Sequence, residues 1–113
     1  MNVILTGIAR SGTTLTCALL NKLSKCVALH EPMNPAYLAT LQFPSGYLDE
    51  IATFFSSQRA SLLSNGSALS KARDGHVPTN PFEAASNEKI LRQSIVKNQL
   101  VNFSKCLPSD FLL

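Results

Sequence analysis

Two short apolar runs enclose a helical repeat near the start of the chain. Val3–Thr6 and Cys26–His30 are apolar and followed by glycine or proline signals, which is typical of strands buried on both faces of a parallel sheet. Between them, Leu15, Leu19 and Leu23 recur at i, i+4 and i+8, the spacing of one apolar helix face. The order strand, helix, strand predicts a right-handed βαβ unit and an α/β fold with a parallel sheet.

The middle of the chain predicts two helices. Asn34 is placed to cap a short helix that begins at Pro35 and runs to Leu41. A longer helix is predicted over Tyr47–Leu63, because its apolar residues fall roughly on one face, and the Asn65-Gly66 pair is its stop signal.

The last part of the chain has weaker patterns. Residues 64–88 are rich in Ser, Asn, Gly and Pro and predict a long loop or lid. A small hairpin is expected after it, with Ile95–Val96 and Leu100–Val101 as its arms. The apolar Phe111–Leu113 is typical of the start of another buried strand.

A parallel sheet of two or three strands cannot cover both of its own faces. We therefore expect one partial domain that is completed by further sequence or by a homo-oligomer that extends the sheet. Its expected parts are the βαβ unit (1–33), a helical segment (34–63), the loop (64–88) and the hairpin with the strand start (89–113).

Composition narrows the class of partner. The chain has 113 residues and a net charge of +3, too small an excess to predict nucleic-acid binding. Its apolar runs fall short of the roughly 18 residues that span a bilayer, so we expect a cytoplasmic protein that does not bind membranes. Cys17, Cys26 and Cys106 form no C-x-x-C pair and are expected to be reduced, with no metal bound.

The stretch GIARSGTTLT has the outline of a phosphate-binding loop. Gly7 and Gly12 allow the backbone to bend tightly, and a helix that begins near Gly12 offers free N–H groups to an anion. Thr13 and Thr14 add hydroxyl donors, and Arg10 adds a planar guanidinium. These residues predict a phosphate or sulfate site; the alternative is an ordinary turn with a capping serine.

The position of the positive charge bears on the chemistry. Thr13 stands where ATP- and GTP-using loops carry a lysine that reaches the outer phosphates beside a magnesium ion. A sulfuryl group carries less charge, so that one cation near its bridging oxygen, here Arg10, suffices without a metal. The loop favours sulfuryl transfer and leaves a P-loop kinase or NTPase as the alternative.

GIARSGTTLTCALLNKL resembles the loop and first helix of sulfotransferases that use 3′-phosphoadenosine 5′-phosphosulfate (PAPS). The arginine form, RSGTT, is most similar to the tyrosylprotein and carbohydrate sulfotransferases, and LHEP at Leu29–Pro32 is a second match. The resemblance implies a P-loop NTP hydrolase-like three-layer α/β/α fold, of which this chain would be the N-terminal part. It also implies PAPS and adenosine 3′,5′-bisphosphate (PAP) as ligands, without a metal.

The resemblance also implies roles for individual residues. Arg10, Ser11, Gly12, Thr13 and Thr14 would hold the 5′-phosphosulfate, and Arg10 would stabilise charge during transfer. Glu31 would be the general base. Taken alone, a glutamate at the position of Glu31 is more often a solvated loop residue or an ion-pair partner of Arg10 than a base. Parallel strands would place Gly7 and Glu31 at one sheet edge, one or two strand spacings apart, about 5–10 Å.

One half of the family's site has no match in this sequence. The second cofactor loop, whose arginine and serine hold the 3′-phosphate, is not found, and we expect a truncated chain that is weakly active or inactive. A self-associating fragment without enzyme activity is a further alternative. The acceptor could be a small molecule, a carbohydrate or a peptide, and no motif selects among them.

Overall fold

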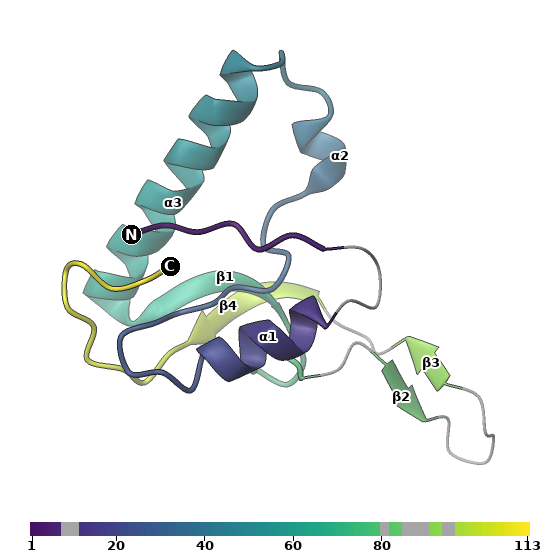
Figure 1. Ribbon diagram of the computed structural model, residues 1–113, viewed down its shortest axis with the longest axis vertical. Coiled ribbons are helices and arrows are strands. Elements are labelled where there is room, and N and C mark those ends of the chain that lie inside the picture. The colour runs from purple at the N-terminus through teal and green to yellow at the C-terminus, as the bar shows by residue number, and fades with distance from the viewer. Residues whose placement is uncertain (8–11, 80–81, 85–90, 94–96) are drawn as a thin grey trace.

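The computed structural model describes residues 1–7, 12–79, 82–84, 91–93 and 97–113. Within these residues, three helices and two small antiparallel sheets form the regular structure (Figure 1). The elements in chain order are α1 (Thr13–Leu20), α2 (Pro35–Leu38), α3 (Ser45–Asn65), β1 (Ser67–Ala72), β2 (Phe82–Ala84), β3 (Leu91–Gln93) and β4 (Lys97–Asn102).

The start of α2 is set by its cap, as the sequence predicts. The side-chain oxygen of Asn34 accepts a hydrogen bond from the N–H of Ala36 at 3.0 Å. Pro35 occupies the first helical position, where its missing N–H costs nothing. The helix ends at Leu38, earlier than the predicted Leu41.

The long helix α3 is confirmed with slightly wider bounds than the predicted Tyr47–Leu63. It ends at Asn65, because Gly66 adopts the left-handed conformation with φ 67° that closes a helix. In Figure 1, α3 stands beside α2 above the β1–β4 sheet. Among the residues that the structure describes, no helix is long and apolar enough to cross a lipid bilayer.

Strand β1 corrects the prediction of a loop over residues 64–88. It pairs antiparallel with β4 along its whole length, and α3 packs against it. Its inner face consists of small side chains, since Ala68, Ser70 and Ala72 are all fully buried. Such a strand carries little hydrophobic signal, which is why its composition favoured a loop.

The predicted hairpin is also wrong where it can be compared. Leu100 and Val101 belong to β4, whose partner is β1 and not the residues just before it. The other predicted arm, Ile95–Val96, lies outside the described residues. A separate two-stranded antiparallel sheet is formed by β2 and β3.

The hydrophobic core joins α3 and the β1–β4 sheet to the second apolar run and the C-terminal residues. Phe111 and Val27 are each only 1% exposed. The burial expected for the last apolar residues is therefore present at Phe111 and at Leu113. The cluster comprises Val27, Leu62, Ala68, Ala72, Val101, Phe103, Phe111 and Leu113.

Parallel pairing in the described residues is confined to a few contacts near the chain ends. Leu112 forms an isolated parallel bridge with Cys26. On its other side, Leu113 donates its N–H to Met1 O at 3.1 Å and accepts from the N–H of Val3 at 2.8 Å, which is the pattern of a parallel bridge. The C-terminal segment (residues 111–113) therefore lies between the N-terminal segment (residues 1–6) and the second apolar run (residues 26–30). All three segments run in one direction.

The predicted three-layer α/β/α fold is wrong; the chain is a small mixed domain. Neither Val3–Thr6 nor Cys26–His30 forms a strand, and the regular sheets among the described residues are two-stranded and antiparallel. The second run hydrogen-bonds to Leu112 near its start and to β1 at its end, where Lys71 donates its N–H to His30 O at 2.9 Å. These contacts leave no extended parallel sheet for helices to cover on two faces.

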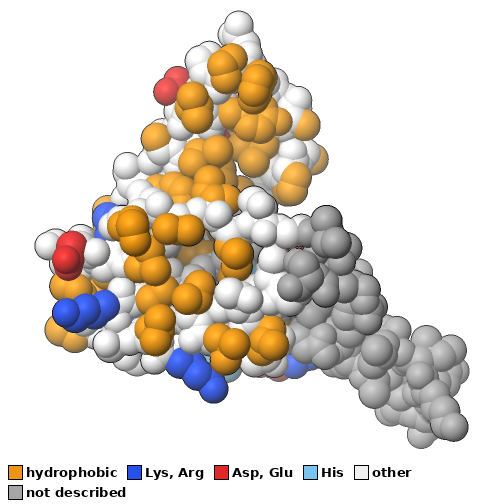
Figure 2. Space-filling view, viewed as in Figure 1, with side chains coloured by type: hydrophobic (Ala, Val, Ile, Leu, Met, Phe, Trp, Pro, Cys, Tyr) orange, Lys and Arg blue, Asp and Glu red, His pale blue; other side chains and the backbone are white. Residues whose placement is uncertain are grey.

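The helix α1 begins where the sequence predicts, but the predicted apolar stripe of leucines faces outward. Leu15, Leu19 and Leu23 are 50%, 51% and 55% exposed, whereas Thr14 and Cys17 are buried. Figure 2 shows hydrophobic side chains gathered over the N-terminal segment and α1, and again over α2 and the upper part of α3. The periodicity identified the helix correctly and its buried face incorrectly.

Candidate functional site

A cavity of about 540 Å³ lies beside the predicted anion-binding loop. Its walls come from the N-terminal segment, α1, the second apolar run with the turn after it, α2, α3 and the C-terminal residues. Gly7 and Thr13 from the predicted loop and the candidate base Glu31 line it. The structure therefore brings parts of the loop and the candidate base to one cavity.

The described part of the loop has the conformation of a helix start. Gly12 has φ 85°, in the left-handed region that glycine adopts without strain, and is the N-cap of α1. Thr13, the first residue of α1, is half-buried and lines the cavity. Thr14 is buried and does not line the cavity. Arg10 and Ser11 lie outside the described residues.

Glu31 is held in an unusual position by an ion pair. Its backbone has φ 38°, a left-handed conformation that costs a residue other than glycine roughly 1–3 kcal/mol. Lys71 Nζ on β1 donates to Glu31 Oε2 at 2.5 Å. This hydrogen bond, together with the charge of Lys71, holds the pKa of the Glu31 carboxyl below its usual range. The carboxylate is therefore ionised at neutral pH.

His30, the residue next to the candidate base, is anchored to β1. Its backbone N–H donates to the Ser70 hydroxyl at 2.9 Å, and its carbonyl accepts from the N–H of Lys71 at 2.9 Å. The side chain is buried, and burial lowers the pKa of His30. Asn98 on β4 adds a weaker hydrogen bond to Pro32 O at 3.4 Å. The turn that carries Glu31 is thus fixed to both strands of the sheet.

The direction of the chain places the loop and the turn at the same end of the cavity. The N-terminal segment and the second apolar run are parallel to the C-terminal segment between them. Gly7 and Glu31 follow these two segments, so both lie at their carboxyl ends. Two strand spacings separate the segments, roughly 10 Å.

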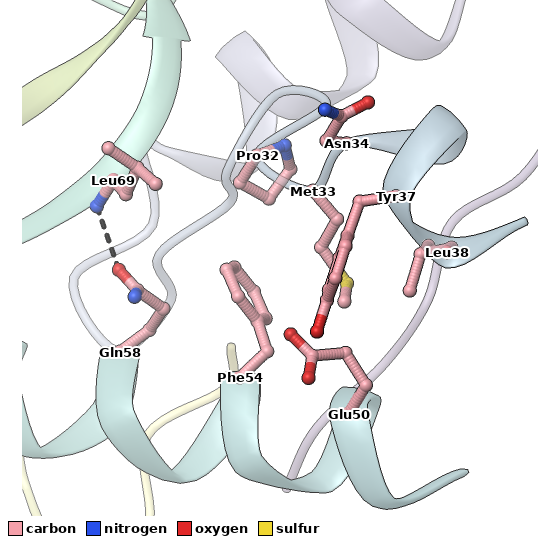
Figure 3. Close-up of a pocket in the computed structure, with 9 residues that line it drawn as sticks. All are labelled: Pro32, Met33, Asn34, Tyr37, Leu38, Glu50, Phe54, Gln58 and Leu69. Atoms are coloured by element: carbon pink, nitrogen blue, oxygen red, sulfur yellow. Dashed lines mark hydrogen bonds between the residues drawn. The ribbon is translucent and has the colours of Figure 1, made fainter. Parts of the chain in front are cut away.

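A smaller cavity of about 190 Å³ adjoins this region between α2 and α3 (Figure 3). Tyr37 and Glu50 point toward one another across it, and Phe54 lies between them and the sheet. Gln58 Oε1 accepts the N–H of Leu69 at 2.8 Å and ties α3 to β1. Phe54 also lines the larger cavity, so the two spaces share a wall.

The described residues contain no group of three or more His, Cys, Asp and Glu side chains that could hold a metal ion. Cys17 and Cys26 are free and buried and line the larger cavity, and Cys106 is free and exposed. Burial raises the pKa of both Cys17 and Cys26. The two cavity thiols are therefore protonated at neutral pH and are poor nucleophiles.

Comparisons with protein-family models, with curated proteins and with solved structures found no match to this chain.

The sequence did not identify Lys71 as part of the site. It offered Arg10 as the ion-pair partner of Glu31. Lys71 lies on β1, a strand that the sequence did not predict, so its pairing with Glu31 could not be anticipated. The apolar walls of the cavity had no local signal either, because they come from segments far apart in the chain.

Proposed function

We propose that this chain carries the phosphosulfate-binding half of a PAPS-dependent sulfotransferase. One observation carries the proposal: Thr13 from the RSGTT motif and Glu31 from the HEP motif line the same cavity. The motifs suggest the family through the resemblance of their residues, and the shared cavity is separate support for it.

The loop residues hold the anionic donor in this proposal. N–H groups at the start of α1 and the hydroxyl of Thr13 donate to the sulfate and the 5′-phosphate, since a helix N-terminus favours an anion. The resemblance also implies roles for Ser11 and Thr14, although the side chain of Thr14 is buried and does not line the cavity. In the role that the resemblance implies, the guanidinium of Arg10 would lie near the bridging oxygen, where negative charge grows during transfer.

Glu31 accepts the proton of the acceptor. The acceptor hydroxyl or amine attacks the sulfur, the bond from sulfur to the bridging oxygen breaks, and PAP leaves with the electron pair. Lys71 occupies Oε2, and among the described residues no other hydrogen bond to Glu31 is present, so Oε1 can accept from the acceptor. The lowered pKa of Glu31 keeps its carboxylate ionised before the reaction. As the acceptor oxygen bonds to sulfur and loses electron density, its proton becomes acidic enough to pass to Glu31.

The binding step is tested by calorimetry with PAP in the presence of EDTA. We expect binding without magnesium, and weaker binding by about tenfold in Thr13→Val, which keeps the shape and loses one hydrogen bond to an anion. Thr53→Val is the matched control, because Thr53 is exposed on α3 and does not line the cavity. Binding of ATP only with magnesium, and none of PAP, would overturn the proposal in favour of a kinase or NTPase.

The chemical step is tested by transfer of labelled sulfate from PAPS to a panel of hydroxyl and amine acceptors. Glu31→Gln removes the base and keeps the size of the side chain. If the unmodified chain transfers sulfate and the variant does so at a similar rate, the role of Glu31 is wrong. PAP binding measured on the same variant separates a lost base from a lost binding site.

A further inference from the structure

The larger cavity has an apolar body and one polar end. Apolar side chains on α3 form one wall, with Ile51, Phe54 and Phe55. Val27 and Leu113 also line the cavity, near the start of the parallel segments. The volume of about 540 Å³ falls within the roughly 300–1,000 Å³ of sites that enclose small organic ligands.

The polar end lies at the carboxyl ends of the same segments. Thr6 ends the N-terminal segment, Thr13 begins α1, His30 ends the second run, and Glu31 follows it. All four line the cavity, so hydrogen-bonding groups gather where the proposed transfer takes place. A ligand with polar groups along its length would leave most of them unpaired against the apolar walls.

We infer that the cavity binds the acceptor and that the acceptor is an apolar molecule with a single hydroxyl group. Its body lies against α3, and its hydroxyl donates to Glu31. A carboxylate in place of the hydroxyl would meet the negative charge of Glu31, so a neutral head group is preferred. The identification of this ligand as the acceptor rests on the proposed function, whereas its binding does not.

The inference is tested first by binding without any cofactor. Calorimetry with 1-hexanol, 1-octanol and 1-decanol measures how affinity depends on chain length. Burial of each added CH₂ group is expected to tighten binding roughly fourfold. Decanoate should bind at least tenfold more weakly than 1-decanol, and glucose should not bind measurably. Equal affinities across the alcohol series would overturn the inference.

A matched pair of variants locates the ligand. Ile51→Trp fills the cavity from α3, and Leu48→Trp places the same side chain on the same helix at a position that is 64% exposed and lines neither cavity. Because the chain contains no tryptophan, emission from each variant also reports whether the new ring is buried. We expect Ile51→Trp to lose 1-decanol binding at least tenfold and Leu48→Trp to keep it. Equal effects of the two substitutions would overturn the inference.

Two further outcomes separate this inference from the proposed function. PAP binding with no binding of 1-decanol would overturn the acceptor class and leave the proposed function standing. Binding of 1-decanol with no binding of PAP would overturn the acceptor role together with the proposed function. A last outcome, measured by light scattering, is a dimer that binds no alcohol and that 1-decanol does not dissociate. In that case a second copy of the chain would be the occupant of the cavity, and the inference would be overturned.

Discussion

The ammonium group of Lys71 lies 2.5 Å from a carboxylate oxygen of Glu31, a residue 40 positions earlier in the chain. The pair joins β1 to a turn whose backbone has a positive φ at Glu31. Hydrogen bonds between His30 and β1 reinforce the same connection. The strained conformation of Glu31 is therefore maintained by the sheet rather than by the local sequence.

Replacing Lys71 with methionine should raise the pKa of Glu31. The substitution keeps most of the stem and removes the hydrogen bond and the positive charge that lower this pKa. In the unmodified protein, the stability from this pair is present above the ordinary carboxyl pKa and is lost as pH falls through the lowered value. NMR titration of the Glu31 side chain measures the change.

The effect of Lys71→Met on stability should be small, no more than about 1 kcal/mol, because the side chains of Lys71 and Glu31 are 35% and 63% exposed and solvent screens the pair. Lys22→Met, an exposed position in the turn after α1, is the control and should leave the titration unchanged. An unchanged Glu31 pKa in Lys71→Met would show that the pair does not persist in solution.

Replacing Arg59 with methionine should destabilise the fold by about 2 kcal/mol, since hydrogen bonds from charged groups contribute strongly. Arg59 on α3 donates to Phe111 O from both terminal nitrogens at 3.1 and 3.0 Å and to Met1 O at 3.1 Å. Its guanidinium also lies 4.2 Å from the centre of the Phe111 ring. Urea unfolding measures the loss, with the exposed Ser56→Ala on the same helix as control; equal midpoints would contradict it.

Local signals account for the parts of the fold that the sequence predicted. The Asn34 side chain fixes the start of α2, and Gly66 fixes the end of α3, because caps act on neighbouring backbone groups. Strand β1 was missed because Ala68 and Ser70 are buried by contacts from elsewhere in the chain and not by their own hydrophobicity. The predicted fold class was wrong for a related reason, because an apolar run does not specify which distant segment it pairs with.

The candidate site was predictable in its motifs and not in its surroundings. Glu31 could be singled out from its place after an apolar run, but its partner Lys71 depends on the pairing of distant segments. The outward turn of Leu15 and Leu19 shows the same limit, since periodicity defines a helix face without saying what covers it.

His30 should make stability depend on pH in mildly acidic solution. Its side chain is buried and faces the charges of Glu31 and Lys71, and its pKa is lowered chiefly by burial. Above the ordinary value of 6.5, both folded and unfolded chains hold a neutral ring. As pH falls below it, the unfolded chain binds the proton first, so the free energy of unfolding decreases until the lowered pKa is reached.

The matched substitutions for this pH dependence are His30→Gln and His76→Gln. The first removes the buried titrating ring and should flatten the dependence below the ordinary histidine pKa of 6.5. The second removes an exposed histidine and should leave the slope unchanged. Urea unfolding at several pH values gives the slopes, and a slope that survives in His30→Gln would assign it to another group.

Gly12→Ala should destabilise the start of α1 by roughly 1–2 kcal/mol. Gly12 has φ 85°, which an alanine adopts only with strain, although among the described residues beyond its chain neighbours no atom lies within 4 Å of the added Cβ. The cost is therefore conformational and not steric. Gly46→Ala is the control, since Gly46 lies within α3 and its added Cβ would meet Leu41 Cβ at an ordinary 3.4 Å; that substitution should be neutral or stabilising. Thermal unfolding measures both, and a Gly12→Ala midpoint no lower than that of Gly46→Ala would show that the left-handed conformation is not required at this position.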